Sequence, residues 1–155
     1  MCKVGDIILV KQYKSHGIDL DRHSFVVLST DNGNIQGLPY DIVCNVMSSF
    51  HSEEHRRRKL KFPGNLEFSH DDENVRNGNE KGGYIKADQF YYFRKSELDY
   101  MVIGNVSVEL FIQLLELIKQ LETIEDITEN LGSPKFYGVS QSFVGSVNGV
   151  CRWGQ

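Results

Sequence analysis

The sequence contains few cysteines and no long hydrophobic run. Its three cysteines, Cys2, Cys44 and Cys151, show no C-x-x-C spacing, and an odd number cannot all pair within one chain. The early apolar run, residues 7–10, is too short for a signal peptide or a membrane-spanning helix. These absences predict a cytoplasmic protein. Cys44 lies in an apolar segment, which favours a small buried core residue.

Common motifs of catalysis and metal binding are also missing. The chain has no P-loop, no G-x-G-x-x-G and no H-E-x-x-H. Its histidines lack metal-ligand spacing: His51 and His55 are four residues apart, as on one helix face, but the charged segment around them is expected to be exposed surface. The acidic stretch 69–74 lacks the ligand pattern of an EF-hand loop. We therefore expect neither a metal ion nor a cofactor.

Charge is distributed unevenly along a chain whose 155 residues suit one domain. Residues 1–63 carry nine Lys/Arg against seven Asp/Glu, whereas residues 64–155 carry eight against fourteen. Five of the N-terminal cations lie in the basic segment 55–61. This segment is either a solvated charged face or an anion-binding rim, because arginine clusters bind phosphate well.

Short apolar segments separated by turn residues predict several strands. They are expected at residues 5–13, 24–30, 41–47, 84–93 and 99–106, with a short one after Pro63-Gly64. A polar loop is expected at 14–23, a hairpin turn at Asn32-Gly33 and a further loop at 69–83.

One amphipathic helix is expected over 108–122, with Ser107 as its N-cap. Its predicted buried residues are Val108, Phe111, Leu115, Ile118 and Leu121. Strands followed by one helix, without βαβ alternation, predict a mainly β fold: a small, highly curved β-barrel with a C-terminal α-helix over residues 1–125. Residues 126–155 are expected to be a poorly ordered extension or weak edge strands.

Polar side chains cluster at one end of the predicted sheet. Arg22, His23 and Ser24 precede the second strand, and Ser48 and Ser49 follow the third. If these strands pair in antiparallel fashion, the start of one lies opposite the end of the other.

An imidazole, a guanidinium and a hydroxyl beside a basic segment suit RNA cleavage. That reaction needs a base for the 2′-hydroxyl, positive charge for the phosphorane and an acid for the leaving oxygen. Histidine titrates in the range that either proton role requires. Alternatively, His23 and Ser24 cap the strand and bond a neighbouring loop.

Four segments carry a resemblance to a known family: VGDIILV, HSFVVLS, DIVCNVMSS and GYIKADQFYYF. With the closing helix, they resemble the MazF/PemK toxins of type II toxin-antitoxin systems over about residues 3–122. The resemblance implies an SH3-like barrel, a homodimer, metal-independent cleavage of single-stranded RNA, and neutralisation by a cognate antitoxin. The loop after the first strand would be a mobile flap over the RNA.

The chain departs from the family pattern at the expected site. The family has R-P-V-V at the start of the second strand, where this chain has His23 in place of the Arg, Ser24 in place of the Pro, and Arg22 one residue earlier. A family Thr corresponds to Met47, with Ser48 as the nearest hydroxyl.

We assign proton transfer to His23, phosphate charge stabilisation to Arg22 and orientation of a phosphate oxygen to Ser48. The expected substrate-binding residues are Ser24, Ser49, Arg56, Arg57, Arg58 and Lys59. Altered or lost catalysis stays open. The alternative function is a non-catalytic binder on the same barrel, either of the gyrase-poison type or a module for nucleic acid or another partner.

Overall fold

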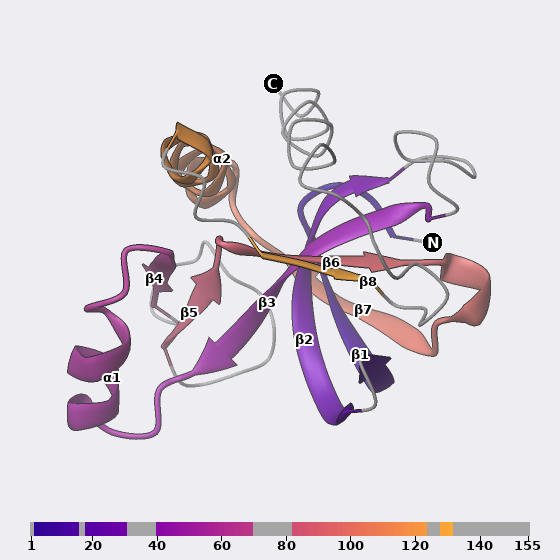
Figure 1. Ribbon diagram of the computed structural model, residues 1–155, viewed down its shortest axis with the longest axis horizontal. Helices are drawn as coiled ribbons and strands as arrows, with labels where there is room; N and C mark the ends of the chain where they lie inside the picture. Colours follow the sequence, from indigo (N-terminus) through magenta and orange to yellow (C-terminus); the bar gives the residue numbers. More distant parts are fainter. Residues whose placement is uncertain (1, 16–17, 31–39, 70–81, 124–127, 132–155) are drawn as a thin grey trace.

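The computed structural model describes residues 2–15, 18–30, 40–69, 82–123 and 128–131. Within these residues, strands dominate and one long helix follows most of them (Figure 1). The elements in chain order are β1 (Asp6–Ser15), β2 (Ile18–Thr30), β3 (Ile42–Ser49), α1 (Glu53–Lys59), β4 (Asn65–Phe68), β5 (Gly83–Lys86), β6 (Gln89–Phe93), the 3-10 helix η1 (Lys95–Glu97), β7 (Tyr100–Asn105), α2 (Val108–Thr123) and β8 (Thr128–Leu131).

All these strands belong to one sheet. Its order is β4-β5-β3-β2-β1-β7, and β6 pairs with β3 and with β8. The pairings are antiparallel, except that β6 and β8 run parallel. β2 and β3 place Ser24 opposite Met47, as the sequence predicts. The Asn32-Gly33 turn expected between them lies outside the described residues.

The sheet is not closed. Among the described strands, β4 and β7 stand at the two ends of the order and do not pair with each other. The mainly β fold with a C-terminal helix is therefore confirmed, whereas the expected closure into a barrel is not.

β5 and β6 pair with the same edge of β3. β5 takes residues 47–49, and β6 takes residues 42–44. Asn45 lies between the two pairings and is fully buried. Its side-chain amide donates to the backbone carbonyl of Gln89 at 2.7 Å, which bridges the break. The single strand expected over 84–93 is therefore split in two.

The central strands are buried on both faces. Along β2, Phe25 and Val27 belong to one hydrophobic cluster, and Val26 and Leu28 belong to another. Because successive strand residues point to opposite faces, one continuous apolar run supplies two cores. Cys44 is buried as predicted, and burial raises the pKa of its thiol well above the ordinary value.

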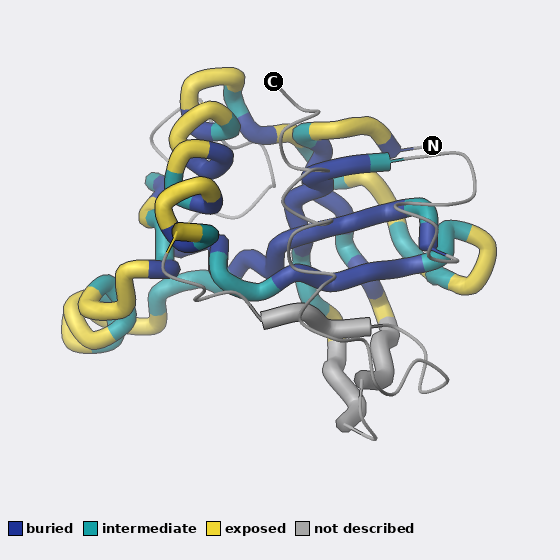
Figure 2. The backbone as a smooth tube through the Cα atoms, turned by 45° about the horizontal axis from the view of Figure 1, so that its top comes forward, coloured by how far each residue is buried: buried dark blue, intermediate teal, exposed yellow. Residues whose placement is uncertain are grey.

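The predicted C-terminal helix is α2, and it covers one of these cores. Its N-cap is confirmed, because Oγ of Ser107 accepts the backbone N–H of Leu110 at 3.1 Å. Figure 2 shows the helix exposed on its outer side and buried on the side facing the sheet. Leu114 and Ile118 are completely buried, so each stabilises the fold by roughly 1.5–3 kcal/mol. The buried residues of α2 are Leu110, Leu114, Leu115, Ile118 and Leu121.

The prediction that Val108 is buried is wrong, since it is 71% exposed. Leu110 takes the buried position in the first turn. Two residues correspond to about 200° around a helix, so Val108 faces away when Leu110 faces the core. Phe111 is only partly buried against the core.

The loop expected at residues 14–23 is a strand hairpin instead. β1 continues to Ser15, and β2 begins at Ile18. Val10 pairs with His23, so His23 lies within β2 rather than before it. Backbone pairing across the hairpin overrides the polar pattern of the side chains.

Four residues of the expected C-terminal extension, 128–131, join the sheet. Thr128–Leu131 form β8 beside β6. Residues 132–155, and 70–81 of the expected loop 69–83, lie outside the described residues. In the part of the chain that the structure describes, no helix is long and apolar enough to cross a membrane.

Candidate functional site

One polar cavity lies where β2, β3, β5 and the α1 region meet. Its volume is about 510 Å³, and its lining is Arg22, His23, Ser24, Met47, Ser48, Ser49, His51, His55, Lys59 and Tyr84. Six of the nine sequence-predicted site residues are among these. The structure therefore brings the two predicted strand ends and one cation of the basic segment together.

The strand register builds one wall of this cavity. β2 pairs with β3 only from Ser24 onward, whereas its pairing with β1 runs from Ile18 to Val26. Arg22 and His23 thus stand where the β1–β2 hairpin extends past β3. Arg22 is exposed, and His23 is half-buried. A half-buried imidazole beside an exposed guanidinium suits proton transfer next to a bound anion.

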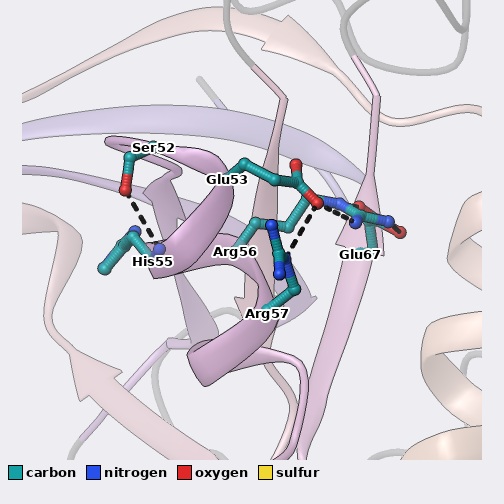
Figure 3. Close-up of polar contacts among 6 residues, drawn as sticks. All are labelled: Ser52, Glu53, His55, Arg56, Arg57 and Glu67. Atoms are coloured by element: carbon teal, nitrogen blue, oxygen red, sulfur yellow. Dashed lines mark hydrogen bonds and ion pairs between the residues drawn. The ribbon is translucent and has the colours of Figure 1, made fainter.

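The other wall comes from a helix that the sequence analysis missed. α1 contains most of the basic segment, and Ser52 is its N-cap, accepting the backbone N–H of His55 at 3.0 Å (Figure 3). Glu53 and Glu54 lie in the first turn, and four cations lie in the last. This order of charges suits the helix dipole. Ser52 followed by two glutamates was the sequence signal for this helix.

Arg56 holds α1 against the sheet. Its guanidinium donates to both carboxylate oxygens of Glu67 in β4, with Nη2 to Oε1 at 3.1 Å, and its Nη1 donates to Glu53 at 3.1 Å. Figure 3 shows Arg56 between these two carboxylates. The hydrogen bonds and charge of Glu67 raise the pKa of Arg56 above its ordinary value. Arg56 is thus engaged away from the cavity.

The other cations of the basic segment differ in placement. Arg57 is exposed and pairs with Glu53 at 3.6 Å. Arg58 is exposed and does not line the cavity. Lys59 is half-buried and lines it. Of the four cations predicted to bind substrate, Lys59 is therefore the one positioned beside Arg22 and His23.

Four further cavity residues were not among the predicted site residues: Met47, His51, His55 and Tyr84. The backbone N–H of His51 donates to Nδ1 of His55 at 3.1 Å. Tyr84 pairs with Ser48 across β3 and β5 and is buried. The spacing of His51 and His55 was the available signal, but His51 precedes the N-cap of α1, so the capped turn rather than a shared helix face brings the two residues together.

The pKa of His55 lies below its ordinary value. Desolvation is the main cause, and the positive charges of His51, Arg58 and Lys59 add to it. The ring of His55 therefore favours its neutral form. Because Nδ1 accepts a hydrogen bond, the neutral ring carries its proton on Nε2.

Among the described residues, no three or more His, Cys, Asp and Glu side chains are grouped so that they could hold a metal ion. No protein-family model matches the chain. A search of curated proteins likewise gives no match.

Proposed function

We propose that the chain is a MazF/PemK-type toxin, an endoribonuclease that cleaves single-stranded RNA in the polar cavity without a metal. The observation that carries the proposal is the set of groups lining that cavity: an imidazole, a guanidinium, an ammonium group and two hydroxyls, from His23, Arg22, Lys59, Ser48 and Ser49. The antiparallel sheet with its C-terminal helix fits a small SH3-like barrel domain over residues 1–125.

Each requirement of the reaction has a candidate side chain. Neutral His23 takes the proton of the ribose 2′-hydroxyl, whose oxygen attacks phosphorus. The bond from phosphorus to the 5′-oxygen breaks, and the leaving oxygen takes up a proton from the imidazolium or from water. Arg22 and Lys59 offset the negative charge of the phosphorane. Ser48 donates a hydrogen bond to a phosphate oxygen.

Partners follow from the same proposal. A cognate antitoxin protein neutralises the toxin, which acts in the cytoplasm as a homodimer. Two copies of the polar cavity, each with Arg22 and Lys59, then flank one RNA strand, giving the positive surface that a single small domain lacks.

Purified protein is expected to cleave mixed single-stranded RNA in EDTA and to leave 2′,3′-cyclic phosphate ends. His23→Ala should lower the cleavage rate by about 10²–10⁴-fold, which is typical for loss of acid–base participation. Arg22→Ala should lower the rate less. The melting temperature of each variant controls for misfolding. An active, folded His23→Ala variant would make His23 a structural residue, and an inactive wild-type protein would reject the nuclease.

A second candidate function is a non-catalytic toxin-like binder. A specific observation favours it: an apolar cavity of about 510 Å³ opens beside the start of α2, lined in part by Val108, Phe111 and Ile112. Val108 and Ile112 are 71% and 50% exposed. Exposed apolar groups of this kind mark protein contacts. Toxicity without RNA cleavage would favour this function.

A further inference from the structure

The proposed cleavage mechanism leaves the two histidines of the α1 region without a role. Their ring centroids lie 4.6 Å apart, and the ring planes are tilted by 36°. His51 is exposed, whereas His55 is half-buried behind it. Both line the polar cavity that also holds Arg22 and Lys59. His51 thus presents an exposed aromatic ring beside the cations of this cavity.

The pair is held in place by hydrogen bonds at both residues. The backbone N–H of His51 donates to Nδ1 of His55 at 3.1 Å, and this hydrogen bond fixes the orientation of the His55 ring. The bond from the His55 backbone N–H to Ser52 fixes the turn that carries it. The outer ring therefore sits on a preorganised support, which lowers the entropy lost when a ligand stacks on it.

Further aromatic rings support His55 from behind. Phe50 and Tyr84 each lie 6.3 Å from its ring centroid. These two rings stack on each other at 5.4 Å with planes 28° apart. Tyr84 is buried in the sheet. The four rings form an aromatic cluster, with Tyr84 in the sheet at one end and the exposed ring of His51 at the other.

The cavity offers two kinds of contact, an aromatic one at the histidines and a positively charged one at Arg22 and Lys59. His55 favours its neutral form because desolvation and the nearby cations lower its pKa. The His55 ring therefore acts as an aromatic group rather than as a phosphate-binding cation. Positive charge comes from Arg22 and Lys59 on the same cavity. A ligand with a flat ring and a phosphate matches both parts.

We propose that the exposed ring of His51, supported by His55, is a stacking site for a nucleobase of single-stranded RNA whose phosphate lies beside Arg22 and Lys59. This inference rests on the proposed function, because it assigns a subsite for the same substrate. Stacking on an aromatic side chain tolerates different bases, since every base has a π-face.

The probe is a DNA oligonucleotide, which lacks the 2′-hydroxyl and cannot be cleaved by this route, with 2-aminopurine placed at each position in turn. Stacking should quench 2-aminopurine fluorescence at one position. His51→Ala should abolish that quenching and weaken binding by roughly 5- to 150-fold, the range for one base–aromatic stack. His51→Phe should keep both. Phe62→Ala is the matched control, because Phe62 is another aromatic residue near α1, is 56% exposed and does not line the cavity.

Salt separates stacking from charge. The loss caused by His51→Ala should be the same at low and high salt, whereas the loss caused by Lys59→Ala should shrink as salt rises. If His51→Phe binds as weakly as His51→Ala, a ring nitrogen acts and the stacking site is rejected. Unchanged quenching in folded His51→Ala also rejects it. If the wild-type protein cleaves RNA but does not quench 2-aminopurine, the stacking site alone is rejected. If it quenches 2-aminopurine but does not cleave RNA, the nuclease alone is rejected. If it does neither, both proposals are rejected.

Discussion

Arg56 and Lys59 lie three residues apart in α1 and have different surroundings. Arg56 is held by Glu53 and Glu67, whereas Lys59 lines the polar cavity. Within the described residues, Lys59 makes no ion pair. Among these residues, a phosphate can therefore bind Lys59 without first breaking an ion pair, whereas it would have to displace two carboxylates from Arg56.

Lys59→Ala should weaken binding of single-stranded RNA and reduce the slope of log K against log salt by about one. Arg57→Ala removes the same charge from the same turn but outside the cavity, so its slope should stay close to that of the wild type. Filter binding across a salt series measures both slopes. Equal slopes for the two variants would contradict the assignment of Lys59 to the substrate.

His55 should make folding stability depend on pH. Its pKa in the folded protein lies below the ordinary 6.5, so the unfolded ring takes up a proton first as pH falls. The unfolding free energy should therefore drop between pH 6.5 and the lower folded-state pKa. Below that range, this contribution stays constant.

The matched control for this pH dependence is His55→Asn, whose amide oxygen can accept the His51 N–H but does not titrate. Other titrating groups are common to both proteins and cancel in the difference. Urea unfolding should show the stability of the wild type relative to His55→Asn declining from pH 8 to pH 5. A constant difference would mean that the ring is not held neutral.

At the level of elements, the sequence predicted the strands and the helix whose positions follow from hydrophobic periodicity. The strands around residues 24–30 and 99–106 and the helix α2 follow from their apolar patterns. α1 was missed because it has no buried residue, so its helix depends on capping and charge order instead of an apolar face. The candidate site could be predicted only in part for this reason: the strand ends were visible in the sequence, but His51, His55 and Tyr84 come together through α1 and β5.

Gly83 keeps β5 close to the end of β3 at the site. A Cβ at this position would lie 2.1 Å from the carbonyl oxygen of Ser48 and 2.8 Å from the ring of Phe68. Gly83→Ala should therefore destabilise the protein by about 1–3 kcal/mol, as overpacking commonly does. It should also lower RNA cleavage, because β5 must move away from β3 to make room for the added Cβ, and this movement displaces Ser48 and Tyr84.

Gly82→Ala is the matched control for Gly83→Ala. Its added Cβ would lie 3.2 Å from the carbonyl oxygen of Phe68, so a shift of a few tenths of an ångström relieves it. Thermal unfolding of the two variants compares the effects directly. If both variants melt alike, close approach of β5 to β3 does not constrain the site.

For the whole molecule, the open sheet and the apolar cavity beside α2 concern assembly. Ile112 and Val108 expose large apolar side chains there. They belong to a helix that is exposed on its outer side and buried on the side that covers the core (Figure 2). A second copy of the chain would bury this surface and bring two polar cavities into one particle. The proposed homodimer therefore accounts for the apolar cavity beside α2.

Light scattering at micromolar concentration should give twice the chain mass of 17.7 kDa. Ile112→Glu places a charge in the apolar cavity and should yield a folded monomer with strongly reduced RNA binding, because one strand then meets the cations of a single chain. Glu116→Gln is the control, since it removes a charge at the same cavity without adding an unfavourable group. A wild-type monomer that cleaves RNA at full rate would contradict the dimer and leave the apolar cavity available for a different protein.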